Sequence, residues 1–378
     1  MSIGFNKPYL TGKETQYILE AVSSAKISGD GAFSKKCHSF FEEQYGFKKV
    51  FLTTSCTDAL EMAALLIDIK PGDELIMPSF TFVSTANAFV LRGAKIIFAD
   101  SRHDHPGMDE DAVALLITPK TKAIVVVHYA GVATDMDIIM ALAEKHKLFV
   151  IEDAAQAIDG YYKAKPLGSI GHLAAFSFHE TKNIMCGEGG MLVVNEEHFI
   201  KRAEIIREKG TNRSAFFRGE IDKYGWVDIG SSFLPSDILA AFLFAQLEHL
   251  DSIQKKRKLI WDIYAEQLKP LKEKGFLSLP YIPGYAGNNA HMFYIVCNNL
   301  QQRTNLIQHL LNNHINAVFH YQSLHKSTFY TSLHDGRILT QADRFTDCLV
   351  RLPMYFELEI EEVTLICNLV KAFYKIHG

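Results

Sequence analysis

The sequence predicts an α/β fold: a large domain with a mostly parallel sheet flanked by helices, and a smaller α+β domain. Between about residues 45 and 195, short apolar stretches alternate with segments of helical period, an order typical of parallel sheets. These stretches are rich in Val, Ile and Phe, as in strands that are buried on both faces. After about residue 250 the pattern becomes mixed. We therefore expect a large domain over residues 1–250 and a small domain over residues 251–378.

The apolar stretches and the periodic segments give the expected elements in order. Between the strands we expect helices at 59–66, 84–91 and 136–146. The strands of the large domain are expected at 50–52, 74–77, 95–99, 123–128, 148–152, 174–178 and 191–194.

The rest of the chain is less regular. A helix over 196–209 should end at Gly210, whereas residues 211–235 are aromatic, polar and rich in glycine. Ser236 or Asp237 can cap a following helix that runs through residues 240–257. In the small domain we expect strands near 290–297 and 317–320.

The composition excludes several classes of protein. Of the 378 residues, 48% are hydrophobic and 22% are charged, which is typical of a soluble globular protein. The net charge of −4 gives no reason to expect a nucleic-acid or membrane partner. The start MSIGFNKPYL lacks the basic and apolar regions of a signal peptide. We therefore expect a cytoplasmic protein.

Neither the cysteines nor the histidines predict a metal site. The six cysteines lie far apart, without a CxxC pair, which favours reduced thiols over disulfides or zinc. The cluster His103-Asp104-His105 lies in the polar stretch DSRHDHPG, which we interpret as an exposed loop. No metal ion is therefore expected.

Residues 151–190 carry the strongest chemical signal. Asp153 and Gln156 in IEDAAQA follow one apolar stretch, and Ser177 and Lys182 in SFHETK end or follow another. Ligands of open α/β sheets bind at the carboxyl ends of strands. Taken singly, the acid could cap a helix and the lysine could be solvated. Together, a lysine amine and a carboxylate match pyridoxal phosphate, which needs both groups.

Two further motifs fit the same cofactor but also have structural interpretations. TTSCTDAL (53–60) joins an apolar stretch to a helix that begins near Asp58. Its backbone amides and hydroxyls can bind a phosphate, or its hydroxyls can simply cap the helix. In MPSFTFVSTANA (77–88), Phe80 or Phe82 can stack on a cofactor ring or pack in the core.

These motifs resemble the sugar-nucleotide aminotransferases, a family of fold-type I pyridoxal-phosphate enzymes, over essentially the whole chain. One branch is especially similar: it converts dTDP-4-keto-6-deoxyglucose to dTDP-4-amino-4,6-dideoxygalactose with glutamate as amino donor. The resemblance implies a homodimer with shared active sites and a role in the synthesis of lipopolysaccharide or another surface polysaccharide. The stretches that carry it are FVSTANAFVLRGAKI, VHYAG, IEDAAQA, FSFHETKN, GEGG and EIIREKGTNRSAFFRG.

The resemblance also implies roles for single residues. Lys182 matches the Schiff-base lysine, and Asp153 matches the partner of the pyridine nitrogen. Gln156 matches the residue near the phenolic oxygen of the ring, and Phe82 the stacking aromatic. The phosphate-binding residues implied are Ser177, Thr57, the backbone at Cys56, and Asn212 from the other subunit.

Substrate residues are implied less directly. His325 matches a histidine near the substrate sugar. Arg213 belongs to the segment 211–228, whose cations and aromatic residues can hold a nucleotide diphosphate or simply form a solvated loop. His179 and Glu180, beside the lysine, are interpreted as structural or supporting residues.

The sequence departs from the family pattern at Cys56, where many relatives have glycine, and it carries Ile184-Met185-Cys186 in a segment that varies within the family. A related dehydratase branch has histidine in place of the lysine, so Lys182 favours transamination. The alternatives are a C3-specific aminotransferase, a dehydratase and a non-catalytic pyridoxal-phosphate-binding regulator. Such regulators usually carry a DNA-binding domain, for which we find no room. A dinucleotide-dependent dehydrogenase would need a GxGxxG turn after an early strand. The segment TTSCTDAL does not provide that turn, which argues against this class of enzyme.

Overall fold

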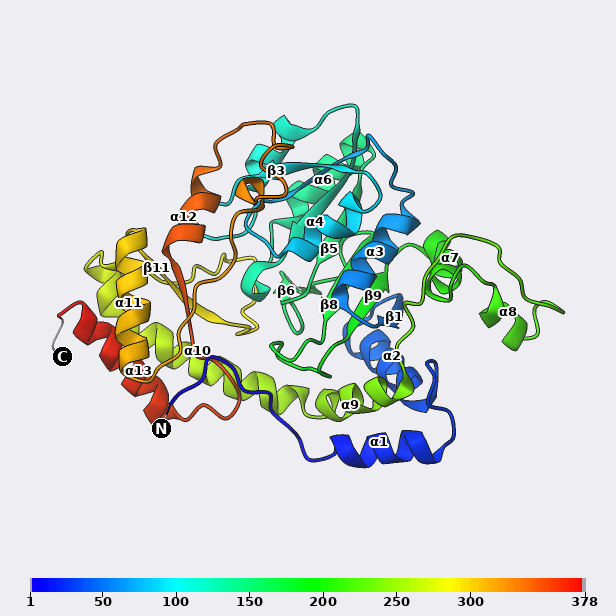
Figure 1. Ribbon diagram of the computed structural model, residues 1–378, viewed down its shortest axis with the longest axis horizontal. Coiled ribbons are helices and arrows are strands. Elements are labelled where there is room, and N and C mark those ends of the chain that lie inside the picture. Colours follow the sequence, from blue (N-terminus) through cyan, green and yellow to red (C-terminus); the bar gives the residue numbers. More distant parts are fainter. Residues whose placement is uncertain (1, 376–378) are drawn as a thin grey trace.

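A mixed seven-stranded sheet lies at the centre of the computed structural model, which describes residues 2–375 (Figure 1). Only β9 runs antiparallel to the other strands, so the predicted α/β fold with a mostly parallel sheet is confirmed. The strands in spatial order are β1 (Lys49–Thr53), β9 (Gly190–Val194), β8 (Leu173–Ser177), β5 (Phe149–Asp153), β4 (Thr121–Val127), β2 (Glu74–Pro78) and β3 (Lys95–Ala99).

Helices cover both faces of this sheet and bury the apolar strands. On one face, α3 (Cys56–Leu66), α4 (Val83–Val90) and α7 (Glu197–Arg207) share a core with alternate strand residues. The other strand residues pack with α2 (Ala32–Tyr45), α6 (Met136–His146) and α9 (Asp237–Leu247). Burial on both faces explains why these strands lack polar alternation.

A third apolar cluster lies in the carboxyl-terminal part and holds Ile3 together with side chains from Ile260 onward. The first cluster also holds side chains from Met292 to Leu349, and the domain boundary at residue 250 stays a prediction. The elements of this part are α10 (Leu250–Glu273), β10 (Leu277–Ser278), β11 (Phe293–Cys297), α11 (Leu300–Asn312), α12 (Thr340–Cys348), β12 (Leu349–Leu352) and α13 (Ile360–Phe373). The remaining elements are α1 (Glu14–Ser23), α5 (Glu110–Val113), β6 (Tyr161–Tyr162), β7 (Lys165–Pro166) and α8 (Arg213–Phe217).

Two predicted elements are wrong. The single helix through 240–257 is two helices, because the chain turns at Glu248 and His249 between α9 and α10. There Lys13 and Tyr17 of the amino-terminal segment bind the Glu248 carboxylate. The strand at 317–320 is only an isolated bridge between Val318 and Arg351. The outer strand β12, which we did not predict, pairs with β11 instead.

The interpretation of DSRHDHPG as an exposed loop is also wrong for part of its length. His105 is 2% exposed, and its Nδ1 accepts a hydrogen bond from Gly107 N at 2.8 Å. Within residues 2–375, no group of three or more His, Cys, Asp or Glu side chains is placed to hold a metal ion. No helix in this range is both long and apolar enough to cross a membrane.

The sheet brings three chain segments to one edge. β1, β5 and β8 run in the same direction, so the residues after Thr53, Asp153 and Ser177 meet there.

β9 returns between β1 and β8, and its first residue is Gly190 of the GEGG motif. A Cβ at Gly190 would lie 2.3 Å from the carbonyl carbon of Ser55 and 2.4 Å from the Cys56 nitrogen. The glycine therefore allows β9 to approach the loop after β1.

We predict that Gly190→Ala destabilises the protein by about 1–3 kcal/mol, the usual cost of overpacking, since the added methyl group meets backbone that cannot move aside. The free energy of unfolding in urea measures the effect. Gly284→Ala is the matched control because a Cβ there meets no atom within 4 Å. Equal stability of the two variants would contradict the close approach.

Candidate active site

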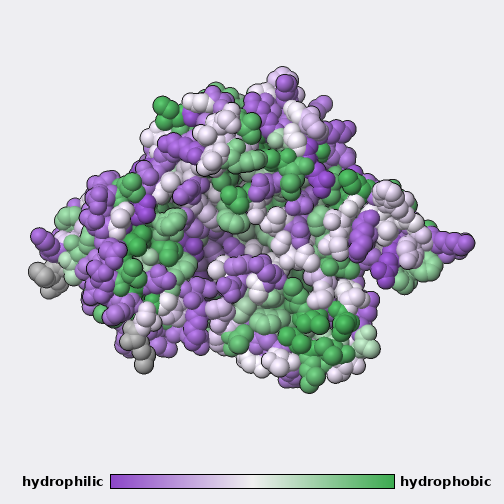
Figure 2. All heavy atoms as spheres, viewed as in Figure 1, coloured by the Kyte–Doolittle hydropathy of each residue, from purple (hydrophilic) through white to green (hydrophobic). Residues whose placement is uncertain are grey.

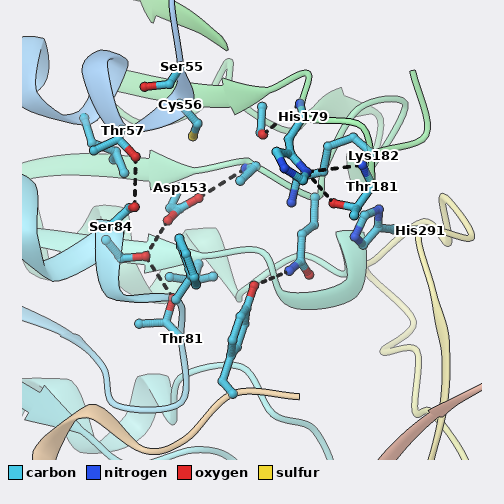
Figure 3. A pocket seen from close by; sticks show the side chains of 18 of the residues that line it. Ser55, Cys56, Thr57, Thr81, Ser84, Asp153, His179, Thr181, Lys182 and His291 are labelled. Atoms are coloured by element: carbon cyan, nitrogen blue, oxygen red, sulfur yellow. Dashed lines mark hydrogen bonds between the residues drawn. The ribbon is translucent and has the colours of Figure 1, made fainter. Parts of the chain in front are cut away.

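A cavity of about 430 Å³ opens at this edge of the sheet (Figure 3). Its walls come from the segments after β1, β5 and β8 and from the start of α4. The carboxyl-terminal part adds His291, His320, Tyr321 and Arg351. In Figure 2 the face is hollowed near its middle, between the parts that carry α3 and α12. The cavity thus lies where the two parts of the chain meet.

Lys182 lies in the turn that follows β8, and its side chain lines the cavity. The backbone N–H of Lys182 donates to the His179 carbonyl at 2.9 Å, which fixes the turn. Burial lowers the pKa of the Lys182 amine, although Cys56 and Asp153 oppose this shift. A less basic amine is more often unprotonated near neutral pH and is therefore a better nucleophile and base.

Asp153 ends β5 and is 6% exposed. Its Oδ2 accepts a hydrogen bond from Thr85 Oγ1 at 2.6 Å, and its Oδ1 accepts one from Ala155 N at 3.2 Å. Burial raises the pKa of this carboxyl, against the effect of the Thr85 hydrogen bond and of Lys182. Within residues 2–375, no basic nitrogen lies within salt-bridge distance of it. The carboxylate therefore suits a cationic group of a ligand.

The segment TTSCTDAL forms the amino-terminal end of α3, which begins at Cys56, two residues before the predicted start. Ser55 caps this helix, since its Oγ accepts from Asp58 N at 3.0 Å. The N–H groups of Cys56 and Thr57 have no partner among the described residues. Ser55, Cys56, Thr57 and Ser177 all line the cavity. Free N–H groups at a helix amino terminus, with hydroxyls beside them, suit a phosphate.

Gln156 and Phe82 lie at the same cavity. Gln156 Oε1 accepts from Ala130 N at 2.6 Å, and its Nε2 donates to the Tyr321 hydroxyl at 2.9 Å. Phe82 is 55% exposed, whereas Phe80 is 1% exposed and packs in the core. An exposed aromatic ring on a cavity wall favours ligand stacking for Phe82 over core packing.

Three of the predicted site residues do not line this cavity. Asn212 and Arg213 lie on the segment around α8, which projects from the body of the molecule (Figure 1). Arg213 stacks on Phe217 there, with 5.0 Å between the guanidinium carbon and the ring centre. His325 is buried, and its Nδ1 shares a hydrogen bond of 2.7 Å with Ser79 Oγ. The structure places none of the three beside Lys182.

The sequence analysis missed Thr85 and the four carboxyl-terminal side chains in the cavity. Thr85 stands in a quoted motif, but only the fold places it against Asp153. His291 Nδ1 lies 2.8 Å from Asn183 Oδ1, and the same amide donates through its nitrogen to Gln254 and Asn289. The Asn183 oxygen must then accept, so His291 carries its proton on Nδ1. Burial lowers the pKa of His291 well below its usual range, so the ring is neutral.

The groups in this cavity fit pyridoxal phosphate. The amino terminus of α3 and nearby hydroxyls suit its phosphate, the Asp153 carboxylate suits a protonated pyridine nitrogen, and the Lys182 amine suits its aldehyde. Each group also lacks a complete set of partners within the described chain. The donors and charges therefore match the cofactor predicted from the sequence.

Comparisons with known proteins show the family of this chain and the cofactor of that family. Residues 8–371 match the DegT/DnrJ/EryC1/StrS aminotransferase family. GDP-perosamine synthase of Escherichia coli O157:H7 is 31% identical over 369 residues, which cover 97% of each chain. The aminotransferase TlmJ from Streptoalloteichus hindustanus is 25% identical, with a TM-score of 0.91 over 99% of each chain. The PLP form of Spr1654, a putative sugar aminotransferase from Streptococcus pneumoniae, is 26% identical, with a TM-score of 0.90 over 99% of this chain and 98% of that one.

We predict that Lys182→Met raises the melting temperature of the cofactor-free protein at neutral pH. Because folding lowers the Lys182 pKa, the unfolded chain binds more protons, and stability rises with pH from the folded pKa up to about the ordinary value of 10.5. The benefit of the substitution is therefore largest below the folded pKa and shrinks as pH rises. A gain on the order of 1 kcal/mol corresponds to about 2 °C.

Thermal unfolding between neutral and alkaline pH measures this difference. The exposed Lys35 is the matched control, and Lys35→Met should change stability by less than about 0.5 kcal/mol at every pH. A lower melting temperature for Lys182→Met at neutral pH would show that the buried Lys182 amine does not destabilise the folded protein.

Proposed function

The chain belongs to the DegT/DnrJ/EryC1/StrS aminotransferase family, and on this premise we propose that it transfers an amino group from L-glutamate to C4 of a 4-keto-6-deoxy nucleotide sugar. It is a sugar aminotransferase, and its cofactor is pyridoxal phosphate. The products would be 2-oxoglutarate and a 4-amino-4,6-dideoxy sugar, in the galacto configuration that the sequence resemblance implies. The observation that carries this proposal is one cavity that holds Lys182, Asp153 and the start of α3.

Lys182 and Asp153 would carry the chemistry. When bound, pyridoxal phosphate supplies an electron-withdrawing ring that stabilises negative charge at the carbon from which a proton is removed. Lys182 Nζ would take that proton and return it elsewhere, a task suited to an amine with a lowered pKa. The Asp153 carboxylate would keep a positive charge at the ring nitrogen, and Thr85 would hold that carboxylate in place.

Other residues of the cavity would position the cofactor. The N–H groups of Cys56 and Thr57 and the hydroxyls of Thr57 and Ser177 would bind its phosphate. In the structure Thr57 Oγ1 donates to Ser84 Oγ at 2.8 Å, and its O–H would turn to the phosphate on binding. Phe82 would stack on the ring, and Gln156 would lie near its phenolic oxygen. The Gln156 side chain is held in place by hydrogen bonds with Ala130 N and the Tyr321 hydroxyl.

Two nucleotides, dTDP and GDP, are candidates for the nucleotide part of the sugar substrate. The sequence motifs resemble the branch that acts on dTDP-4-keto-6-deoxyglucose. GDP is the second candidate, because relatives from Escherichia coli and Caulobacter vibrioides, 31% and 33% identical, are GDP-perosamine synthases. In both cases we propose a cytoplasmic reaction that serves the synthesis of lipopolysaccharide or another surface polysaccharide.

We further propose a homodimer in which each subunit completes the site of the other through Asn212. The projecting segment around α8 carries exposed apolar side chains, among them Phe217, Trp226 and Ile229, which are 68%, 84% and 51% exposed. A second apolar surface lies over α1 and α9 (Figure 2), where Leu19 and Val22 are exposed. Exposed apolar surfaces of this kind favour contact with another protein, and a second copy is the occupant that would bring Asn212 to a cavity.

We predict that the purified protein, given L-glutamate and dTDP-4-keto-6-deoxyglucose, forms a 4-amino sugar that NMR identifies by its substitution and configuration. The GDP-linked ketone tests the second carrier in the same assay. Lys182→Ala should lower the rate by about 10²–10⁴-fold, the usual contribution of a general acid–base. Amination at C3, or loss of a hydroxyl without amination, would support the C3-specific aminotransferase or the dehydratase instead.

Asp153→Asn should bind cofactor yet lose most of its rate, at least about tenfold, since the amide keeps the Thr85 hydrogen bond but loses the charge. Cofactor absorbance measures binding, and steady-state turnover measures the rate. An unchanged kcat would rule out a role for this charge.

A further inference from the structure

His291 presents one unpartnered ring nitrogen to the cavity. The residue is 4% exposed and lies on the side of the cavity that carries Thr181 and Lys182 (Figure 3). Its Nδ1 is hydrogen-bonded to Asn183. Its Nε2 has no hydrogen-bond partner within residues 2–375, and it is not sealed from solvent. This second nitrogen is therefore free to meet a ligand in the cavity.

The hydrogen bonds around Asn183 determine which ring nitrogen carries the proton. The Asn289 carbonyl can only accept, and it lies 3.0 Å from Asn183 Nδ2. The other atom of the amide, Asn183 Oδ1, is therefore the acceptor for His291 Nδ1 at 2.8 Å. Burial and, after it, the charge of Lys182 hold the pKa of His291 well below its usual range. A neutral ring with its proton on Nδ1 leaves Nε2 as an acceptor only.

Two neighbours of His291 on the same wall offer no defined acceptor. The Tyr321 hydroxyl already accepts from Gln156 Nε2 at 2.9 Å, which leaves its own proton to donate. His320 Nδ1 lies 2.7 Å from the Tyr129 hydroxyl. Because a hydroxyl can donate or accept, this contact does not fix the tautomer of His320.

Arg351, the fourth side chain that the carboxyl-terminal part adds to the cavity, carries donors only. Its guanidinium carbon lies 4.5 Å from the centre of the Phe5 ring. Of the four side chains on this wall, His291 is therefore the one whose hydrogen bonds define a free acceptor.

The backbone around His291 holds the ring in place. His291 N donates to Asn289 Oδ1 at 3.0 Å, and the His291 carbonyl accepts from Arg257 Nη2 at 2.5 Å. Asn289 Nδ2 donates in turn to the carbonyls of Gln156 and Ile158, at 2.7 and 2.8 Å. These bonds tie His291 to the segment that carries Gln156, so the ring starts from a rigid position, as a binding residue requires.

We infer that His291 Nε2 accepts a hydrogen bond from the hydroxyl at C3 of the sugar substrate. This inference rests on the proposed function, in which C4 of the sugar reacts beside Lys182. In a 4-keto-6-deoxy sugar, C3 carries a hydroxyl, whereas C5 carries a methyl group and the ring oxygen. The C3 hydroxyl is therefore the only hydrogen-bond donor on a carbon next to C4.

Glutamate offers no comparable group. Its only hydrogen-bond donor is the reacting amine itself, and its two carboxylates only accept. A free acceptor near Lys182 therefore matches the sugar better than it matches glutamate. His291 would act in the second half-reaction, in which the keto-sugar takes up the amino group, and it would select sugars that keep the C3 hydroxyl.

The test compares nucleotide-linked keto-sugars with and without the C3 hydroxyl. We expect the native enzyme to use the 4-keto-6-deoxy sugar about tenfold better, as kcat/KM, than its 3-deoxy analogue, the effect of one hydrogen bond. His291→Phe should lose most of this preference, because its ring accepts no such bond. His291→Gln should keep part of the preference, because its amide oxygen can accept near the place of Nε2.

His309→Leu is the matched control, since His309 lies outside the cavity and its Nε2 lies 3.1 Å from the Leu369 carbonyl. This variant should keep the full preference for the C3 hydroxyl. Rapid mixing of the cofactor-loaded enzyme with L-glutamate, followed through cofactor absorbance, measures the first half-reaction. In His291→Phe, the keto-sugar half should fall about tenfold more than the glutamate half.

A second readout needs neither cofactor nor turnover. Nitrogen NMR of the isotope-labelled, cofactor-free protein distinguishes protonated from unprotonated ring nitrogens, and the His291 signals are identified by their absence in His291→Gln. We expect the proton on Nδ1 and a free lone pair on Nε2 at neutral pH. Addition of the nucleotide-linked 4-amino sugar should shift the Nε2 signal, whereas its 3-deoxy analogue should not. A proton on Nε2, or equal shifts with both sugars, would overturn the inference.

The outcomes distinguish this inference from the proposed function. Amination at C4 with no preference for the C3 hydroxyl, or with the same preference in the native enzyme and in His291→Phe, would overturn the role of His291 alone. If His291→Phe does not fold, the NMR shifts of the native protein decide. Amination of neither sugar would instead overturn the proposed substrate.

Discussion

The burial of one carboxylate, that of Asp153, is the constraint on which the site depends. It ends the strand β5 between β4 and β8, where a negative charge is poorly solvated and needs donors and a cation. Thr85 and Ala155 supply two donors, but the described chain supplies no salt bridge. Burial likewise disfavours the charged form of Lys182, whose charge is positive, in the same cavity. In the function we propose, pyridoxal phosphate would give Asp153 a cationic partner and would bind the Lys182 amine, so cofactor binding would stabilise the folded protein.

Much of this arrangement follows from local sequence. Strands buried on both faces lose polar alternation, so the central sheet and its flanking helices were predictable, and so were Asp153 and Ser177 at strand ends with Lys182 shortly after. The break at Glu248 was not predicted, and the side chains that bind its carboxylate, Lys13 and Tyr17, are distant in sequence. The strand β12 was missed because its four residues are too short to show a period. Only the fold could bring Thr85 or Arg351 to the cavity.

The two parts of the chain contribute differently to the site. The groups that suit the cofactor come from residues 53–190, mainly from turns after strands, where motifs are compact and readable in sequence. The cavity-lining side chains of the carboxyl-terminal part come from scattered positions after residue 290, each placed by tertiary contacts. This asymmetry explains why the family and the cofactor follow from the sequence while the nucleotide carrier does not. Asn212 and Arg213 add a further difficulty, since a single chain holds them away from its own cavity.

The contact between Phe5 and Arg351 joins the two extremes of the polypeptide. Met354 N also donates to the Phe5 carbonyl at 3.4 Å, so the amino-terminal segment is laid against a strand that the ribosome makes some 350 residues later. During translation, the nascent chain can assemble the central sheet and expose Lys182 long before the arginine emerges. The order of synthesis therefore separates a stage at which Asp153 and Lys182 are present from a later stage at which the carboxyl-terminal wall of the cavity is complete.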